Sequence, residues 1–100
     1  MEKKNQITQK RLDKYFSVTE EAYNMAIESG NRHPKLNKER EDFLDMIKRY
    51  IKDSKHFEEQ GNIVNAFAAL NYAHGWLDAG ARLGLFDVHN SRLCTVDDKD

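Results

Sequence analysis

Breaks in the helix-forming pattern are few, and they divide the chain into three long runs. The sequence contains one proline and five glycines among its 100 residues. The stretch SGNRHPKLN (residues 29–37) predicts one clear loop, because Gly30 suits the position just after a helix and Pro34 stops a helix from running through. Gly61 and Asn62 predict a second, shorter break, in which a glycine ends one helix and an asparagine caps the next.

Each run carries apolar side chains at helical spacing, which predicts helices over residues 7–29, 38–60 and 63–84. The stretch SVTE (residues 17–20) matches a capping box and could begin a helix. The apolar pattern passes straight through it, however, which favours one continuous first helix. Asn37 is expected to cap the second helix. None of the runs shows the two-residue alternation of a strand.

The three runs predict an all-α fold, a three-helix up-down-up bundle with a short C-terminal tail. The two-residue break at Gly61–Asn62 makes the second and third helices an antiparallel hairpin. The helices have similar expected lengths of about 33–35 Å at 1.5 Å per residue. We expect one helical domain over residues 7–86, between a flexible N-terminus of residues 1–6 and a tail of residues 87–100.

Composition excludes several classes of protein. The formal net charge of −1 argues against non-specific nucleic-acid binding, which needs a surplus of Lys and Arg. One cysteine, Cys94, allows neither an internal disulfide nor a zinc site built of thiolates. The polar start MEKKNQITQKR is not a signal peptide, and no stretch is apolar enough to span a membrane. We therefore expect a cytoplasmic protein with no membrane or nucleic-acid partner and no cofactor.

The third run is more apolar than a bundle requires. On a helical wheel its polar arc is only about 60° wide and consists of Asn71, Gly75, Asp78 and Arg82. Two neighbouring helices would cover only about half of the remaining surface. The excess surface must be covered by the tail, through residues such as Phe86, Leu93 and Val96, or by a second copy. The candidate interaction surface consists of Phe67, Tyr72, Trp76 and Leu83.

One edge of the third run carries mostly small side chains at helical intervals: Ala66, Ala69, Ala73, Leu77, Gly80 and Gly84. Small side chains let another backbone approach closely. That gain must offset the ~1 kcal/mol that each mid-helix glycine costs relative to alanine. The approaching backbone is either the first or second helix of the same chain or a second copy. Leucine in place of Gly80 is expected to disrupt the packing by overfilling it.

Candidate catalytic and metal-ligating residues are sparse. His74, Asp78 and Arg82 lie one turn apart and form a candidate polar cluster, in which Asp78 is expected to pair with Arg82. Two ligands on one helix do not complete a metal site, and the chain contains no Glu-x-x-His motif of the di-metal helical bundles. The sequence therefore predicts no metal, no cofactor and no catalytic residue.

Three stretches resemble a known family: LDKYFSVTEEA (residues 12–22), EDFLDMIKRYIKDSKHF (residues 41–57) and NAFAALNYAHGWLDAGARLGLF (residues 65–86). They are similar to the short archaeal proteins grouped as domain of unknown function 357, and the resemblance covers roughly residues 10–96. It implies a small all-helical archaeal protein. It carries over no catalytic residue, because the family defines none.

Two hypotheses for function follow. The leading one is a non-enzymatic interaction or scaffold module that acts through the third helix, as a homodimer or with another protein. The alternative is an RNA- or nucleotide-associated helical domain that resembles the HEPN ribonucleases and has hydrolytic activity. Those ribonucleases carry an arginine and a histidine separated by four to six intervening residues. Arg49 with His56 and Arg82 with His89 match that spacing, but neither arginine is followed by a polar residue.

Overall fold

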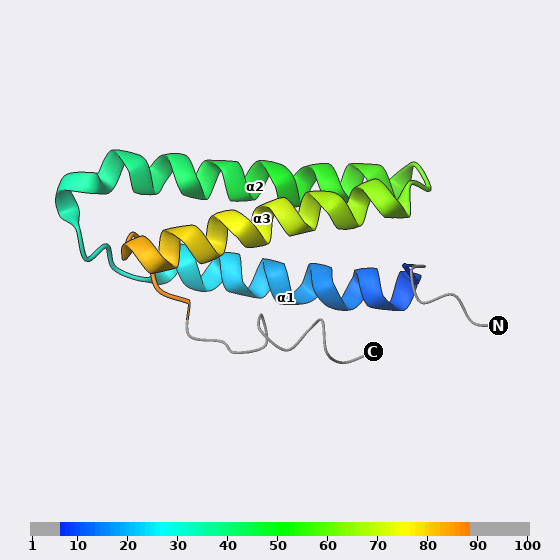
Figure 1. The fold of residues 1–100 in the computed structure, drawn as a ribbon, viewed down its shortest axis with the longest axis horizontal. Coiled ribbons are helices and arrows are strands. Elements are labelled where there is room, and N and C mark those ends of the chain that lie inside the picture. The colour runs from blue at the N-terminus through cyan, green and yellow to red at the C-terminus, as the bar shows by residue number, and fades with distance from the viewer. Residues whose placement is uncertain (1–6, 89–100) are drawn as a thin grey trace.

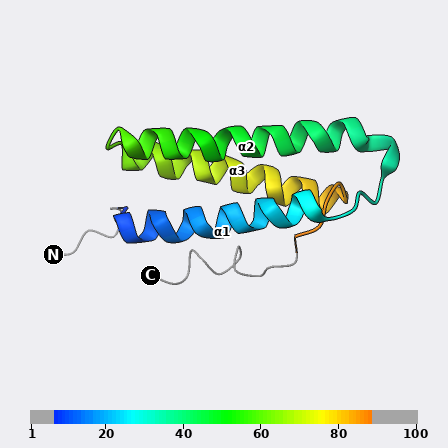
Figure 2. The same cartoon turned by 180° about the vertical axis from the view of Figure 1, so that it is seen from behind.

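A computed structural model of the chain describes residues 7–88, which form three long α-helices packed together with no strand among them. Helix α1 spans Gln9–Glu28, α2 spans Asn37–Glu59 and α3 spans Ile63–Leu83, and a short 3-10 turn, η1, spans Pro34–Leu36. The helices run up, down and up again, so that α1 and α3 are parallel and α2 is antiparallel to both (Figures 1 and 2). The predicted three-helix bundle is therefore confirmed.

The predicted helix limits are confirmed to within about two residues, and the first helix runs unbroken through SVTE. Thr8 caps α1, and its side chain accepts a hydrogen bond from the backbone N–H of Arg11 at 3.1 Å. Gly61 has a φ of 79°, and the Asn62 side chain accepts from the N–H of Asn65 at 3.2 Å, so this short stop and restart is confirmed. Gly84, with a φ of 80°, ends α3 in the left-handed conformation.

The prediction that Asn37 caps α2 is wrong. Asn37 is the first residue inside α2, and the cap position belongs to Leu36, which makes no side-chain capping bond. The physical reason is Pro34, whose fixed φ suits the first position of a helical turn. The chain therefore enters α2 from a 3-10 turn that begins at Pro34. Asn37 lies past the point where a cap would act.

The end of α1 is held by an arginine of α2. The Nη2 group of Arg40 donates to the carbonyl oxygens of Ala26, Ile27 and Ser29 at 3.2, 3.2 and 3.0 Å. Its Nε donates to the carbonyl oxygen of Leu85 at 3.0 Å. A guanidinium at a helix C-terminus satisfies carbonyl groups that have no partner within the helix. Arg40 thus joins the last turn of α1, the start of α2 and the segment after α3.

The core consists of two groups of buried side chains. One lies toward the turn between α1 and α2 and contains Ala22, Ala26, Leu44, Ile47, Ile51, Ala73, Leu77, Leu85 and Phe86. The other lies toward the turn between α2 and α3 and contains Leu12, Tyr15, Val18, Ala66 and Leu70. Between α2 and α3, the buried Ser54 hydroxyl donates to the carbonyl oxygen of Ala66 at 2.8 Å. No helix within residues 7–88 is long and apolar enough to cross a membrane.

The small edge of α3 faces the inside of the bundle. Its members Ala66, Ala69, Ala73, Leu77 and Gly80 are all buried. At Gly80 the neighbour is the ring of Phe86, which the left-handed Gly84 turns back onto the end of the helix. A Cβ built on Gly80 would lie 2.6 Å from Cε2 of that ring, far inside contact distance. Gly80 is closely approached, but by the Phe86 side chain of the segment after α3 and not, as expected, by the backbone of α1, α2 or a second copy.

Candidate functional site

Helix α3 is covered on one side and open on the other. Its buried side meets α1 and α2 through the small edge and Leu70. Its open side carries a row of exposed residues one turn apart, which we call the α3 outer strip: Val64, Ala68, Tyr72, Gly75, Ala79 and Leu83. Val64, Tyr72 and Leu83 expose 66%, 62% and 52% of their surface. The strip is thus a line of residues that stay largely exposed within residues 7–88.

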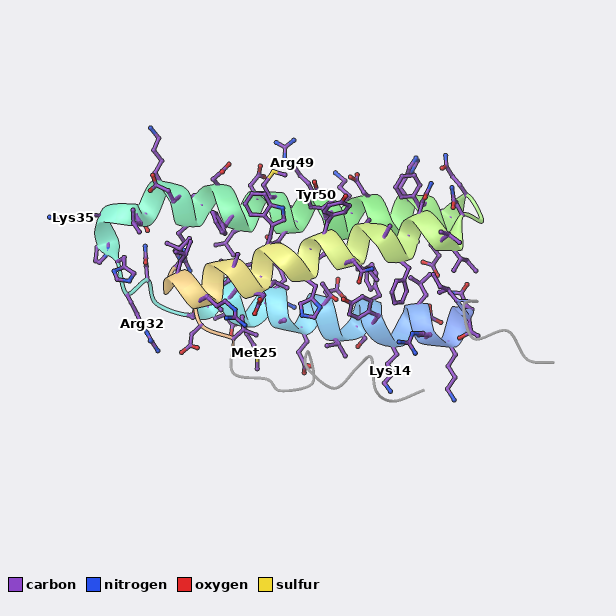
Figure 3. The ribbon with its side chains drawn as sticks, viewed as in Figure 1. Lys14, Met25, Arg32, Lys35, Arg49 and Tyr50 are labelled. Carbon is purple, nitrogen blue, oxygen red and sulfur yellow. The ribbon has the colours of Figure 1, made fainter. Side chains whose placement is uncertain are left out.

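The strip is bordered by aromatic rings of α2. The rings of Tyr50 and Tyr72 are stacked, with centroids 5.3 Å apart and an interplanar angle of 19°. One turn further along α3, the rings of Trp76 and Phe43 meet edge-on, with centroids 4.8 Å apart and an interplanar angle of 86°. In Figure 3 Tyr50 lies on the α3 side of α2, whereas Arg49 points away from the bundle. The open face of the molecule therefore includes the aromatic side chains Phe43 and Tyr50 of α2 as well as the outer strip of α3.

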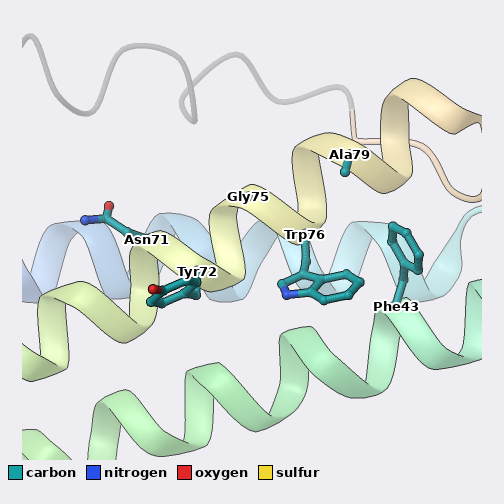
Figure 4. A pocket seen from close by; sticks show the side chains of 6 residues that line it. All are labelled: Phe43, Asn71, Tyr72, Gly75, Trp76 and Ala79. Carbon is teal, nitrogen blue, oxygen red and sulfur yellow. The ribbon is translucent and has the colours of Figure 1, made fainter.

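A shallow hollow of about 320 Å³ lies on this face. Its lining consists of Phe43, Asn71, Tyr72, Gly75, Trp76 and Ala79 (Figure 4). Gly75 forms its floor on the α3 side, and a Cβ built there would meet no atom within 4 Å. Intramolecular packing therefore does not require a glycine at this position, although mid-helix glycine costs about 1 kcal/mol relative to alanine.

The four residues of the predicted interaction surface do not share one face. Tyr72 and Leu83 are exposed on the outer strip. Trp76 is half-buried at the strip's border against Phe43. Phe67 lies on the other flank of α3, where its ring is 4.9 Å from that of Tyr15 on α1. Phe67 is therefore partly buried and packs against the core between α1 and α3.

The predicted polar cluster is divided between two flanks of α3. Nε of Arg82 donates to Oδ2 of Asp78 at 3.1 Å, which is the expected pair, and both side chains are more than half exposed. His74 does not join them, since its Nδ1 lies 2.7 Å from the hydroxyl of the buried Tyr15. His74 thus contributes to the packing of α1 on α3.

Three of the four arginine and histidine residues that match the ribonuclease-like spacing lie within the described residues. Arg49 is exposed, and its Nε donates to Oδ2 of Asp45 at 2.8 Å. His56 is exposed near the end of α2, where its ring is 6.3 Å from that of Phe57. His89 lies outside the described residues, as do Cys94 and the tail residues Leu93 and Val96. Within residues 7–88 no three His, Cys, Asp or Glu side chains gather as metal ligands.

Sequence reasoning missed three contributors to the open face: Val64, Gly75 and Tyr50. Val64 and Gly75 could have been found from the wheel, because they lie in the middle of the face opposite the small edge. The wheel places Gly75 in the polar arc, although a residue without a side chain adds no polarity. Tyr50 gave no signal of its own, since its role depends on how α2 is aligned with α3.

A family model described as "Protein of unknown function (DUF357)" matches residues 14–86. These residues include all of α2 and α3, most of α1 and the Phe86 that packs on Gly80. No curated protein and no solved structure matches the chain.

Proposed function

This chain belongs to the DUF357 family of proteins of unknown function, and from that premise we propose that it is a non-enzymatic helical interaction module that binds protein through the outer strip of α3. The observation that carries the proposal is the exposure of three large apolar side chains, Val64, Tyr72 and Leu83, along a single helix. A contiguous exposed apolar patch on a small protein is typical of an interaction site.

The composition of the strip supports protein as its ligand. Ala68, Gly75 and Ala79 lie between the larger side chains of the strip, so that the backbone of a partner helix could approach α3 closely. Tyr72 lies on the strip and Trp76 borders it, and these two residue types are enriched among those that dominate protein interfaces. The polar groups next to the strip are Asn71, at the edge of the hollow, and the exposed ion pair of Asp78 and Arg82. Apolar contact is therefore the main source of binding energy.

We extend the proposal to the setting of the protein, which is the cytoplasm of an archaeal cell. A single cysteine, which cannot form an internal disulfide, is typical of a reducing compartment. The archaeal source follows from the family resemblance described above.

Affinity capture from an extract of the native cells, followed by mass spectrometry, tests the proposal. The bait is the tagged chain as wild type, as Tyr72→Glu and as Ile27→Glu. Ile27 is the matched control, because it is an exposed apolar side chain on α1, at 45% exposure, outside the strip. Exposed substitutions of this kind change stability little, so both variants should keep the helical circular dichroism of the wild type.

The expected result is a bound protein, another copy of the chain included, that Tyr72→Glu loses and Ile27→Glu retains. A charge placed on an apolar contact must be desolvated without a partner, which costs far more than losing the contact. The proposal is wrong if the wild type and Tyr72→Glu capture the same proteins in the same amounts.

A further inference from the structure

We infer that the partner of the outer strip is a second copy of this chain, bound antiparallel about a two-fold axis so that Tyr72 of each copy enters the hollow over Gly75 of the other. The inference rests on the proposed function, since it names the occupant of the same face. Its first support is the shape of the strip. Tyr72 is the largest exposed side chain on the strip, and Gly75 is the position with open space above it.

Tyr72 and the hollow over Gly75 lie where a two-fold axis can bring the tyrosine of each copy to the hollow of the other. The proposed two-fold axis is perpendicular to α3 and passes midway between Tyr72 and Gly75. It therefore places Tyr72 of each copy level with Gly75 of the partner. The same axis puts Ala68 level with the partner's Ala79, and Val64 level with the partner's Leu83. Tyr72 thus meets Gly75 at the centre, small side chains meet on either side of this pair, and large apolar ones meet at the ends. In this register the strip is complementary to itself.

The hollow is on the correct side of α3 to receive the ring. It lies between Tyr72 and Ala79, with Trp76 and Phe43 on its α2 side (Figure 4). In the antiparallel arrangement the partner's Tyr72 arrives at the level of Gly75 and on the same α2 side. A volume of about 320 Å³ accommodates an aromatic side chain. Two stacked tyrosine pairs, each made of Tyr50 and Tyr72, would then flank the axis.

The charges of α2 provide a second and independent support. The contacts of Tyr50 with Tyr72 and of Phe43 with Trp76 place the proposed axis beside Met46 and Ile47 of α2. The net exposed charge of α2 changes sign at this level. Before it the exposed charged residues are Lys38, Glu39, Glu41, Asp42 and Asp45, with a net charge of −3; after it they are Lys48, Arg49, Lys52, Asp53, Lys55 and Glu59, with a net charge of +2.

An antiparallel partner sets the acidic half of each α2 beside the basic half of the other. A parallel partner would set like charges together and be repelled. The self-complementary register of α3 and the sign change of α2 are centred on the same level of the molecule, although they lie on different helices. This coincidence favours a second copy over an unrelated protein as the occupant of the face.

Sedimentation equilibrium of the full chain tests the inference. The wild type is expected at twice 11.7 kDa at micromolar concentration. Gly75→Leu fills the hollow and should weaken dimerisation at least about tenfold, as overfilling of a packed contact does. The same change should not unfold the monomer, because a Cβ at position 75 meets no atom within 4 Å. Asn24→Leu, which adds a leucine to the exposed face of α1, should leave dimerisation unchanged.

Cross-linking tests the direction of the partner. In a Cys94→Ser background, Ala68→Cys and Ala79→Cys are treated with a short bifunctional maleimide. A mixture of the two variants should give much more cross-linked dimer than either alone, because the antiparallel register pairs position 68 with position 79. Efficient cross-linking of Ala68→Cys by itself would indicate a parallel pair and overturn the inference.

The outcomes separate the inference from the proposed function. A monomeric wild type overturns the inference, while the loss of a different captured protein by Tyr72→Glu would still support the function. A dimer that Gly75→Leu leaves intact also overturns the inference, because its contact then lies elsewhere. A dimer weakened by Gly75→Leu and cross-linked in the mixture alone supports both.

Discussion

Thr19 carries a buried hydroxyl that has no hydrogen-bond partner among the described residues. A buried polar group without a partner costs about 1–3 kcal/mol, so Thr19→Val should stabilise the protein by about 1 kcal/mol. Ser54→Ala is the matched comparison, because the Ser54 hydroxyl is equally buried and donates to Ala66. That change should destabilise by about 1 kcal/mol. Urea unfolding of both variants checks the pair. If both variants shifted the free energy of unfolding equally and in the same direction, the expected difference between Thr19 and Ser54 would be contradicted.

Tyr23 connects stability to pH at the alkaline end. Burial raises the pKa of Tyr23 above its ordinary value of 10.0, and the carboxylates of Asp45 and Glu41 raise it further. The folded state thus favours the neutral phenol. Its contribution to stability is fully present below the unfolded pKa and is lost as the pH rises through the folded pKa.

Removal of the Tyr23 hydroxyl should therefore reduce the loss of stability at alkaline pH. Tyr23→Phe is expected to lose less stability than the wild type as the pH rises above about 10. Urea midpoints measured at a series of alkaline pH values give the comparison. Identical declines in the two proteins would show that Tyr23 does not couple folding to pH.

The end of α1 depends on an arginine that lies on another helix. Arg40→Met keeps most of the apolar stem but removes the bonds to the carbonyl oxygens of Ala26, Ile27, Ser29 and Leu85. We expect a loss of about 2–3 kcal/mol, because hydrogen bonds from a charged donor are the stronger class. Arg40→Lys should recover only part of this loss, since an ammonium lacks the planar fork. Thermal melting measures both, and a full recovery by lysine would contradict the geometry.

Gly80 and Phe86 should be energetically coupled. Gly80→Ala should destabilise the wild type, because the new Cβ overlaps the Phe86 ring. In a Phe86→Ala background the same change should stabilise by about 1 kcal/mol, which is the helix propensity of alanine over glycine. Gly75→Ala, measured at a concentration where the chain is monomeric, is the control and should stabilise in both backgrounds. A double-mutant cycle with no coupling would show that the ring does not rest on Gly80.

The helices could be predicted from the sequence because their signals are local. Apolar spacing, Pro34 and the Gly61–Asn62 break each act within a few residues, and they located all three helices. The contacts at the ends of the helices could not be predicted in this way. The bonds of Arg40 and the return of Phe86 onto Gly80 join segments that the chain brings together only after it turns.

The candidate site shows the same limit. A helical wheel orders the side chains around α3, but it does not say which neighbour occupies which flank. Phe67 and Tyr72 were therefore grouped together, although one packs on Tyr15 of α1 and the other stacks on Tyr50 of α2. The pairing of His74 with Tyr15 was hidden for the same reason, because it joins residues that are far apart in the chain.

The proposed pair of molecules should be sensitive to salt. If the acidic half of one α2 lies beside the basic half of the other, screening weakens their attraction. The Debye length falls from about 10 Å at 0.1 M salt to about 3 Å at 1 M. We expect sedimentation equilibrium to show a larger dissociation constant in high salt. A dimer that tightens steadily with salt would indicate that its contact is apolar alone and that the charge pattern of α2 has no part in it.

The three-residue connection of Gln60, Gly61 and Asn62 also determines the order in which the bundle assembles. Helices α2 and α3 meet across a short turn, so their contacts close small loops and cost little chain entropy. Every contact of α1 with α3 has to close a loop that contains all of α2. The α2–α3 hairpin is then the early structure on the folding path, and α1 docks onto it last. By the same reasoning α1 detaches first, and its amide protons should exchange with solvent deuterium sooner than those of the hairpin.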